Sequence, residues 1–131
     1  MSERDLKTRT KAFALRILKL VDELPKTTAG RALSTQIVRS GTSIAANYRT
    51  ACRAKSTADF IAKMGIVEEE ADETLFWPES LEESQLLAPA KLMAIKQEAD
   101  ELIAILVASI KTTRRNRANN SALPIPHSAL E

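Results

Sequence analysis

The spacing of apolar residues constrains the fold of this chain more than any other feature. Early in the chain, one apolar stripe recurs at the heptad-like positions Leu6, Phe13, Ile17, Leu20 and Leu24. Comparable stripes follow in three later segments. This spacing matches the period of about 3.6 residues of an α-helix, whereas a half-buried strand would alternate apolar and polar residues. The pattern therefore predicts an all-α protein.

Prolines and capping residues divide the pattern into four helices. The helix starts are marked by two capping boxes and one first-turn proline: Ser2 with Asp5, Ser56 with Asp59, and Pro89. We expect helices at 4–24, 31–53, 57–86 with a kink near Pro78, and 89–113, packed as an antiparallel up-down-up-down four-helix bundle. Residues 1–113 would form the bundle domain. Residues 114–131 would form a flexible basic C-terminal tail.

The second predicted helix has three different faces. Beside its apolar face runs a strip of small polar residues, which includes Ser40, Ser43 and Asn47. We expect this strip to contact another helix or another subunit, with Asn47 largely buried and hydrogen-bonded to another helix, because a buried amide without partners costs about 1 to 3 kcal/mol. Gly41, in the middle of the same helix, marks either a close helix approach or a kink.

The third predicted helix carries apolar residues outside its core stripe. Ile66 and Trp77 lie roughly opposite that stripe, where a monomeric bundle would leave them in water. Exposed apolar patches of this kind usually mark a partner surface. We therefore expect a homo-oligomer in which Ile66 and Trp77 lie at the interface.

Charge is strongly segregated along the chain, although the net charge is only +2. Residues 25–58 carry six basic side chains and no acidic one, and residues 59–86 carry nine acidic side chains and one basic one. Two interpretations stay open. The basic residues either contact the phosphates of RNA or DNA, or pair with acidic residues of the third helix at subunit interfaces of a protein-interaction scaffold. The candidate nucleic-acid-binding residues are Arg31, Arg39, Arg49, Arg53, Lys111, Arg114, Arg115 and Arg117.

No pattern in the sequence points to an enzyme. His127 is the only histidine and lies in the predicted tail, which leaves no Ser-His or Cys-His pair on a rigid scaffold. Cys52 is the only cysteine, and a Glu-x-x-His motif and a phosphate-binding glycine loop are both lacking. We expect no catalytic residues, no metal and no cofactor. With neither a signal peptide nor a long apolar segment, the chain is expected to be cytoplasmic and without a membrane partner.

The chain also resembles a known family. The resemblance is carried by QIVRSGTSIAANYR at 36–49, ACRAKS at 51–56, DFI at 59–61, KM at 63–64, IVEEEADETL at 66–75 and Trp77. These runs resemble the four-helix-bundle proteins encoded in intervening sequences of bacterial 23S ribosomal RNA genes, also labelled S23 ribosomal proteins. The resemblance implies a ring-shaped homopentamer without enzymatic activity. Similarity to the accessory protein of diversity-generating retroelements implies nucleic acid and a reverse transcriptase as partners. Thr50 and Pro78 depart from the family pattern, which usually has glutamate at the first position and continues Trp-Leu at the second.

Overall fold

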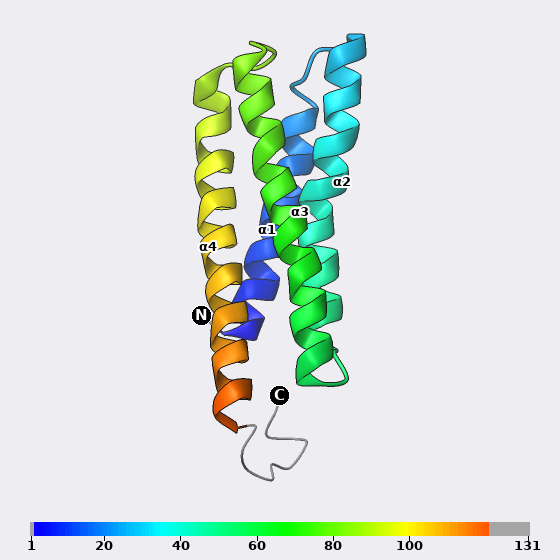
Figure 1. Cartoon of the computed structure of the whole chain (residues 1–131). Coiled ribbons are helices and arrows are strands. Elements are labelled where there is room, and N and C mark those ends of the chain that lie inside the picture. The colour runs from blue at the N-terminus through cyan, green and yellow to red at the C-terminus, as the bar shows by residue number, and fades with distance from the viewer. Residues whose placement is uncertain (1, 121–131) are drawn as a thin grey trace.

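Four antiparallel helices form the computed structural model, which describes residues 2–120 (Figure 1). They are α1 (Glu3–Val21), α2 (Thr28–Ala51), α3 (Thr57–Glu83) and α4 (Pro89–Asn120). Each helix packs against the next one in the chain, and α1 also contacts α4, so the helices surround one core. No strand occurs in the described range. The prediction of an all-α up-down-up-down bundle is confirmed.

The helix starts follow local capping chemistry. At α1, the Ser2 hydroxyl accepts from the Asp5 amide (3.1 Å) and the Asp5 carboxylate accepts from the Ser2 amide (3.3 Å), which confirms the capping box. At α2, the Thr27 hydroxyl accepts from the amide of Gly30 (3.1 Å), so the helix begins at Thr28, three residues before the predicted start. Such a cap satisfies one of the amides that a helix start leaves unpaired.

The start of α3 is capped as predicted on one side only. The Ser56 hydroxyl accepts from the Asp59 amide (3.1 Å), but the Asp59 carboxylate accepts from the Lys55 amide (3.1 Å) instead of returning to Ser56. Lys63, one turn further on, also pairs with Asp59 (2.8 Å). The helix start is therefore held by a cap and an ion pair.

α3 continues through Pro78 and ends at Glu83, before the predicted residue 86. The chain turns because Gln85 adopts a left-handed conformation (φ 61°). The amide of Leu86 then donates to the Leu81 carbonyl and the amide of Gln85 to the Glu82 carbonyl, both at 3.1 Å. This is the Schellman arrangement that closes many helices.

α4 is longer than predicted. It continues to Asn120, so the prediction of a flexible tail is wrong for residues 114–120, and residues 121–131 lie outside the described range. The segment contains neither glycine nor proline, and its arginines and alanine are good helix formers. Positive side chains at a helix C-terminus also interact favourably with the helix dipole. The predicted boundary at 113 reflected the loss of apolar residues, which ends the packing of the helix but not the helix.

The core lies along the axis of the bundle and contains every residue of the apolar stripe predicted for the first helix. Gly41 explains how closely α1 and α2 approach there. A Cβ atom built on Gly41 would lie 2.8 Å from Cγ1 of Ile17, which is fully buried. Of the two explanations for Gly41, close helix approach is therefore correct.

Candidate functional site

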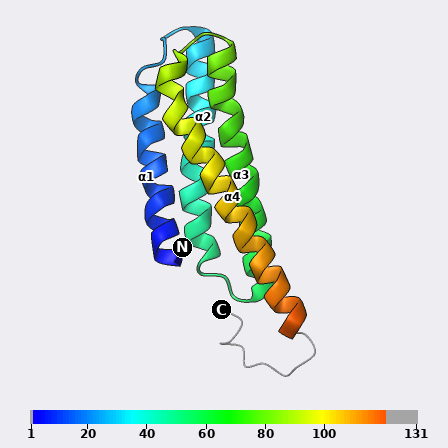
Figure 2. The same cartoon turned by 90° about the vertical axis from the view of Figure 1, so that its left-hand side faces the viewer.

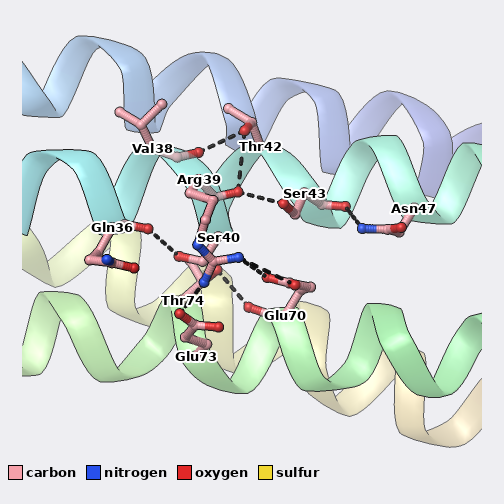
Figure 3. A network of polar contacts seen from close by, with 10 residues as sticks. All are labelled: Gln36, Val38, Arg39, Ser40, Thr42, Ser43, Asn47, Glu70, Glu73 and Thr74. Atoms are coloured by element: carbon pink, nitrogen blue, oxygen red, sulfur yellow. Dashed lines mark hydrogen bonds and ion pairs between the residues drawn. The ribbon is translucent and has the colours of Figure 1, made fainter.

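The strip of small polar residues on α2 is satisfied within its own helix (Figure 3). Ser40 is fully buried and donates to the Gln36 carbonyl (3.0 Å), and Ser43 donates to the Arg39 carbonyl. Asn47 is only half-buried, and its side-chain amide donates to the Ser43 carbonyl (2.9 Å). The predicted hydrogen bond from Asn47 to another helix is wrong, because the carbonyl four residues earlier is always within reach in a helix.

Arg39 is the one predicted nucleic-acid-binding residue that the structure pairs with carboxylates. Its guanidinium contacts Glu70 (3.3 Å) and Glu73 of α3, as Figure 3 shows. The hydrogen bond from Arg39 lowers the pKa of the Glu73 carboxyl and raises the pKa of the Arg39 guanidinium. Charge pairing between the basic second helix and the acidic third helix thus exists within one chain, at this residue.

The other seven predicted basic residues are exposed and make no ion pair with any described residue. They are Arg31, Arg49, Arg53, Lys111, Arg114, Arg115 and Arg117. Six of them come together in space. Arg49 and Arg53 lie at the C-terminus of α2, and the remaining four belong to the C-terminal part of α4. Arg31 lies near the start of α2 and therefore at the opposite end.

The C-termini of α2 and α4 lie at the same end of the bundle (Figures 1 and 2). An open pocket of about 870 Å³ confirms this, because it is lined by residues 51–54 of α2 and its loop, by Ala108, Ser109, Thr112 and Thr113 of α4, and by residues 2–3 at the N-terminus. The first turn of α1 adds Arg4, which is exposed and was missed from the sequence. Its signal was the antiparallel topology, which brings the N-terminus of α1 beside the C-terminus of α2. We call this region the basic end; it comprises Arg4, Arg49, Arg53, Lys55, Lys111, Arg114, Arg115 and Arg117.

The acidic residues near the basic end already have partners close to them in the sequence. Glu3 pairs with Lys7 (3.3 Å), Asp59 pairs with Lys63 (2.8 Å), and Asp5 belongs to the cap of α1. At the opposite end, α3 and α4 instead surround a second pocket lined by Glu79, Glu82, Glu83 and Asp100 together with Lys96, which pairs with Glu82. The excess of unpaired positive side chains is therefore found at one end of the bundle.

A bidentate ion pair holds α4 against α1 along the bundle. Arg9 donates from Nε to Glu98 (2.8 Å) and from Nη2 to the other Glu98 oxygen (2.6 Å), and also reaches Glu101 (3.1 Å). The side chains of Arg9 and Glu98 are 24% and 18% exposed. The hydrogen bonds from Arg9 lower the pKa of the Glu98 carboxyl. This pair therefore fixes α4 to α1 near residues 98–101.

The pocket at the basic end offers no activated nucleophile. Tyr48 and Cys52 line it, and burial raises the pKa of the Tyr48 hydroxyl and of the Cys52 thiol. Both groups are therefore protonated at neutral pH, and the thiolate is the form of cysteine that reacts. Within residues 2–120, no group of His, Cys, Asp and Glu side chains is suited to hold a metal ion.

The outer face of α3 carries a separate apolar surface. Ile66 and Phe76 are 48% and 52% exposed, and a Cβ atom on neighbouring Gly65 would meet nothing within 4 Å. The predicted exposure is confirmed for Ile66 and wrong for Trp77. Trp77 is half-buried against the core, with the ring of Phe76 packed edge-on at 4.8 Å, because its side of α3 turns toward α2. The indole Nε1 is buried and has no hydrogen-bond partner among the described residues.

The fold and the charge distribution define an antiparallel four-helix bundle with one basic end. A family model for the 23S rRNA-intervening sequence protein matches residues 3–108, and the chain belongs to that family. It is also similar to the crystal structure of a protein of unknown function from the S23 ribosomal protein family of Bacteroides thetaiotaomicron. The two are 37% identical with a TM-score of 0.78, over 85% of this chain and 99% of the other.

No curated protein matches the chain. Within the described residues, no helix is both long and apolar enough to cross a membrane.

Proposed function

We propose that this protein is a non-enzymatic, self-associating four-helix bundle that binds the phosphate backbone of RNA or DNA through its basic end. One observation carries the proposal. Seven of the eight basic residues predicted for nucleic-acid binding are exposed without a carboxylate partner in the described chain, and six of them gather at one end. Arginine and lysine side chains that are free of carboxylates are available to displace counterions from phosphates.

The scaffold interpretation is favoured at one residue only. Arg39 forms ion pairs with Glu70 and Glu73 of its own chain, so fewer of its N–H groups are available to bind a phosphate than in the unpaired residues. If pairing between subunits engages the rest, nucleic-acid binding should be negligible. The two functions therefore make opposite predictions for the basic end.

The test compares two pairs of substitutions on the same helix. Arg49→Gln with Arg53→Gln removes two charges from the basic end, whereas Arg31→Gln with Arg39→Gln removes two charges outside it. In a filter-binding titration with nucleic acid at about 50 and 200 mM salt, we expect the first pair to weaken binding and lower the salt slope by about two, and the control pair to change both less. Negligible binding by the wild type at low salt would leave the scaffold. Equal effects of the two pairs would refute the basic end as the binding site.

Self-association is the second part of the proposal, and the family suggests a homopentamer. The outer face of α3 supports it, because Gly65 would cost about 1 kcal/mol in an isolated helix and no intramolecular contact explains its presence. A glycine beside exposed Ile66 permits close approach of a neighbouring helix. We expect light scattering to give a pentamer mass at micromolar concentration and a smaller mass for Ile66→Glu. Met93→Glu, at a side chain that is 67% exposed on α4, is the control and should not change the mass. A monomeric wild type would contradict this part.

A further inference from the structure

We propose that the C-terminal segment of α4, residues 111–120, binds the backbone of double-stranded nucleic acid, and that the basic end prefers a duplex to a single strand. This inference rests on the proposed function and names its ligand class. We call residues 111–120 the α4 extension. The family match ends at residue 108, so the extension lies beyond what the family match covers.

The α4 extension projects from the bundle instead of packing in it. Ile110 is the last buried residue of α4 before residue 120. Among residues 111–119, Thr113 is partly buried and all the others are exposed. In both Figure 1 and Figure 2, α4 continues past the level of the loop that joins α2 to α3. At about 1.5 Å per residue, the extension adds roughly 15 Å of helix. A helix with almost no apolar surface to bury is positioned for a polar partner.

The charges of the α4 extension are arranged on one side. At about 100° per residue, Lys111, Arg114, Arg115 and Arg117 fall within an arc of about 160°. Threonine and asparagine occupy the other side, at Thr112, Asn116 and Asn119. The extension therefore presents a basic stripe with no acidic residue in it.

The density of this stripe matches a duplex better than a single strand. Lys111 and Arg117 are separated by about 9 Å along the helix axis, a length over which a duplex carries about five phosphate charges and an extended single strand fewer than three. Four positive charges over that length can be matched by a duplex. On a single strand, some of them would have no phosphate within reach.

The basic end also lacks the feature that single-strand binders use. Single strands gain much of their affinity by stacking bases on exposed aromatic rings. The aromatic residues nearest the basic end are Tyr48, which is 4% exposed, and Phe60, which is partly buried against the core. The well-exposed aromatic of the described chain is Phe76, on the acidic helix α3. A single strand would therefore obtain only phosphate contacts here, and fewer of them.

The experiment measures fluorescence anisotropy of a labelled DNA duplex and of one of its strands with the full chain. Arg114→Gln with Arg117→Gln tests the α4 extension, and Arg16→Gln with Lys19→Gln removes two exposed charges from α1 as the matched control. We expect the wild type to bind the duplex about tenfold more tightly than the strand. The α4 pair should lose about tenfold in duplex affinity and about two units of salt slope, whereas the control pair should lose less. Far-ultraviolet circular dichroism checks that both variants keep their helices.

The outcomes separate this inference from the proposed function. If the strand binds as tightly as the duplex, or if the α4 pair behaves like its control, the inference is wrong. The proposed function would still stand as long as Arg49→Gln with Arg53→Gln weakens binding. If the wild type binds neither DNA nor RNA, both are wrong.

Discussion

The contact between Gly41 and Ile17 gives the sharpest test of the packing between α1 and α2. Replacing Gly41 by alanine places a Cβ atom 2.8 Å from Cγ1, 3.0 Å from Cγ2 and 3.3 Å from Cβ of Ile17. Favourable carbon contacts lie at about 3.5 to 4.0 Å, so the two helices must separate by several tenths of an ångström. Ile17 is fully buried and β-branched, and therefore has no free rotamer into which to move.

The magnitude follows from two opposing effects. Alanine is favoured over glycine in a helix interior by about 1 kcal/mol, and overpacking a close-packed core costs about 1 to 3 kcal/mol. We expect Gly41→Ala to lower the free energy of unfolding by about 1 kcal/mol, or about 3 to 5 °C in melting temperature for a chain of this size. Gly65→Ala is the matched control, made in the Ile66→Glu background so that contacts between subunits do not act on it. Nothing lies within 4 Å of its added Cβ atom, so only the helix preference of alanine should act, and the fold should gain about 1 kcal/mol.

The assay is urea denaturation followed by circular dichroism, with all variants at one protein concentration. Light scattering in parallel detects any change in self-association by Gly65→Ala, which would otherwise be mistaken for a change in stability. In an Ile17→Ala background, the atoms that clash are gone, and Gly41→Ala should no longer destabilise. If Gly41→Ala stabilises the wild type as much as Gly65→Ala does, the close approach of α1 and α2 does not limit this position and the reasoning fails.

Three further substitutions are measured in the same way. Gly30→Ala should destabilise by about 2 kcal/mol or more, because its Cβ atom would overlap the Pro25 carbonyl oxygen, a backbone atom that cannot rotate away; a neutral result would contradict this. Gln85→Gly should stabilise by about 0.5 to 1 kcal/mol, because glycine adopts φ 61° without strain; a loss of stability would refute the left-handed turn. Glu98→Gln should cost about 1 kcal/mol at neutral pH by weakening the pair with Arg9. Because folding lowers the Glu98 pKa from its usual 4.5, this contribution is present above pH 4.5 and is lost as the pH falls through the lowered value, so variant and wild type should converge in acid.

The apolar periodicity predicted the bundle because burial in a helix depends mainly on the direction of a side chain around the axis. The four heptad-like positions within α1 point the same way, and all four are buried, as is Leu24 just beyond the end of the helix. The same reasoning failed for Trp77, whose direction lies between the outer face of α3 and the side that meets α2. A large ring at such a border packs against the core, whereas Phe76, about 100° away around the helix, stays exposed. Position at the edge of a face cannot be resolved by periodicity alone.

The polar strip on α2 shows a second limit of sequence reasoning. A buried hydroxyl or amide must be hydrogen-bonded, but the sequence does not say to what. We assigned the partner of Asn47 to another helix, whereas Ser40, Ser43 and Asn47 all donate to carbonyls of α2 itself. Small polar side chains that are hydrogen-bonded in this way add little bulk, and they need no hydrogen-bond partner on the facing helix. Their pattern indicates close packing of α2 without identifying a specific interhelical bond.

The basic end could not be predicted from the charge of successive sequence segments, because the order and direction of the helices bring its residues together. Arg53 and Lys111 are far apart in the sequence, and an up-down-up-down bundle brings the C-termini of α2 and α4 together with the N-terminus of α1. Net charge is therefore a poor guide to this chain, since the acidic residues that offset it lie mainly along α3. In a ring whose rotation axis runs along the helices, all basic ends would lie on one face and their potentials would add. In a dimer with a perpendicular two-fold axis they would lie on opposite faces, and one nucleic acid would contact a single basic end. The salt slope for one bound duplex thus depends on the symmetry of the assembly, and it should exceed the slope available to one chain only if the basic ends share a face.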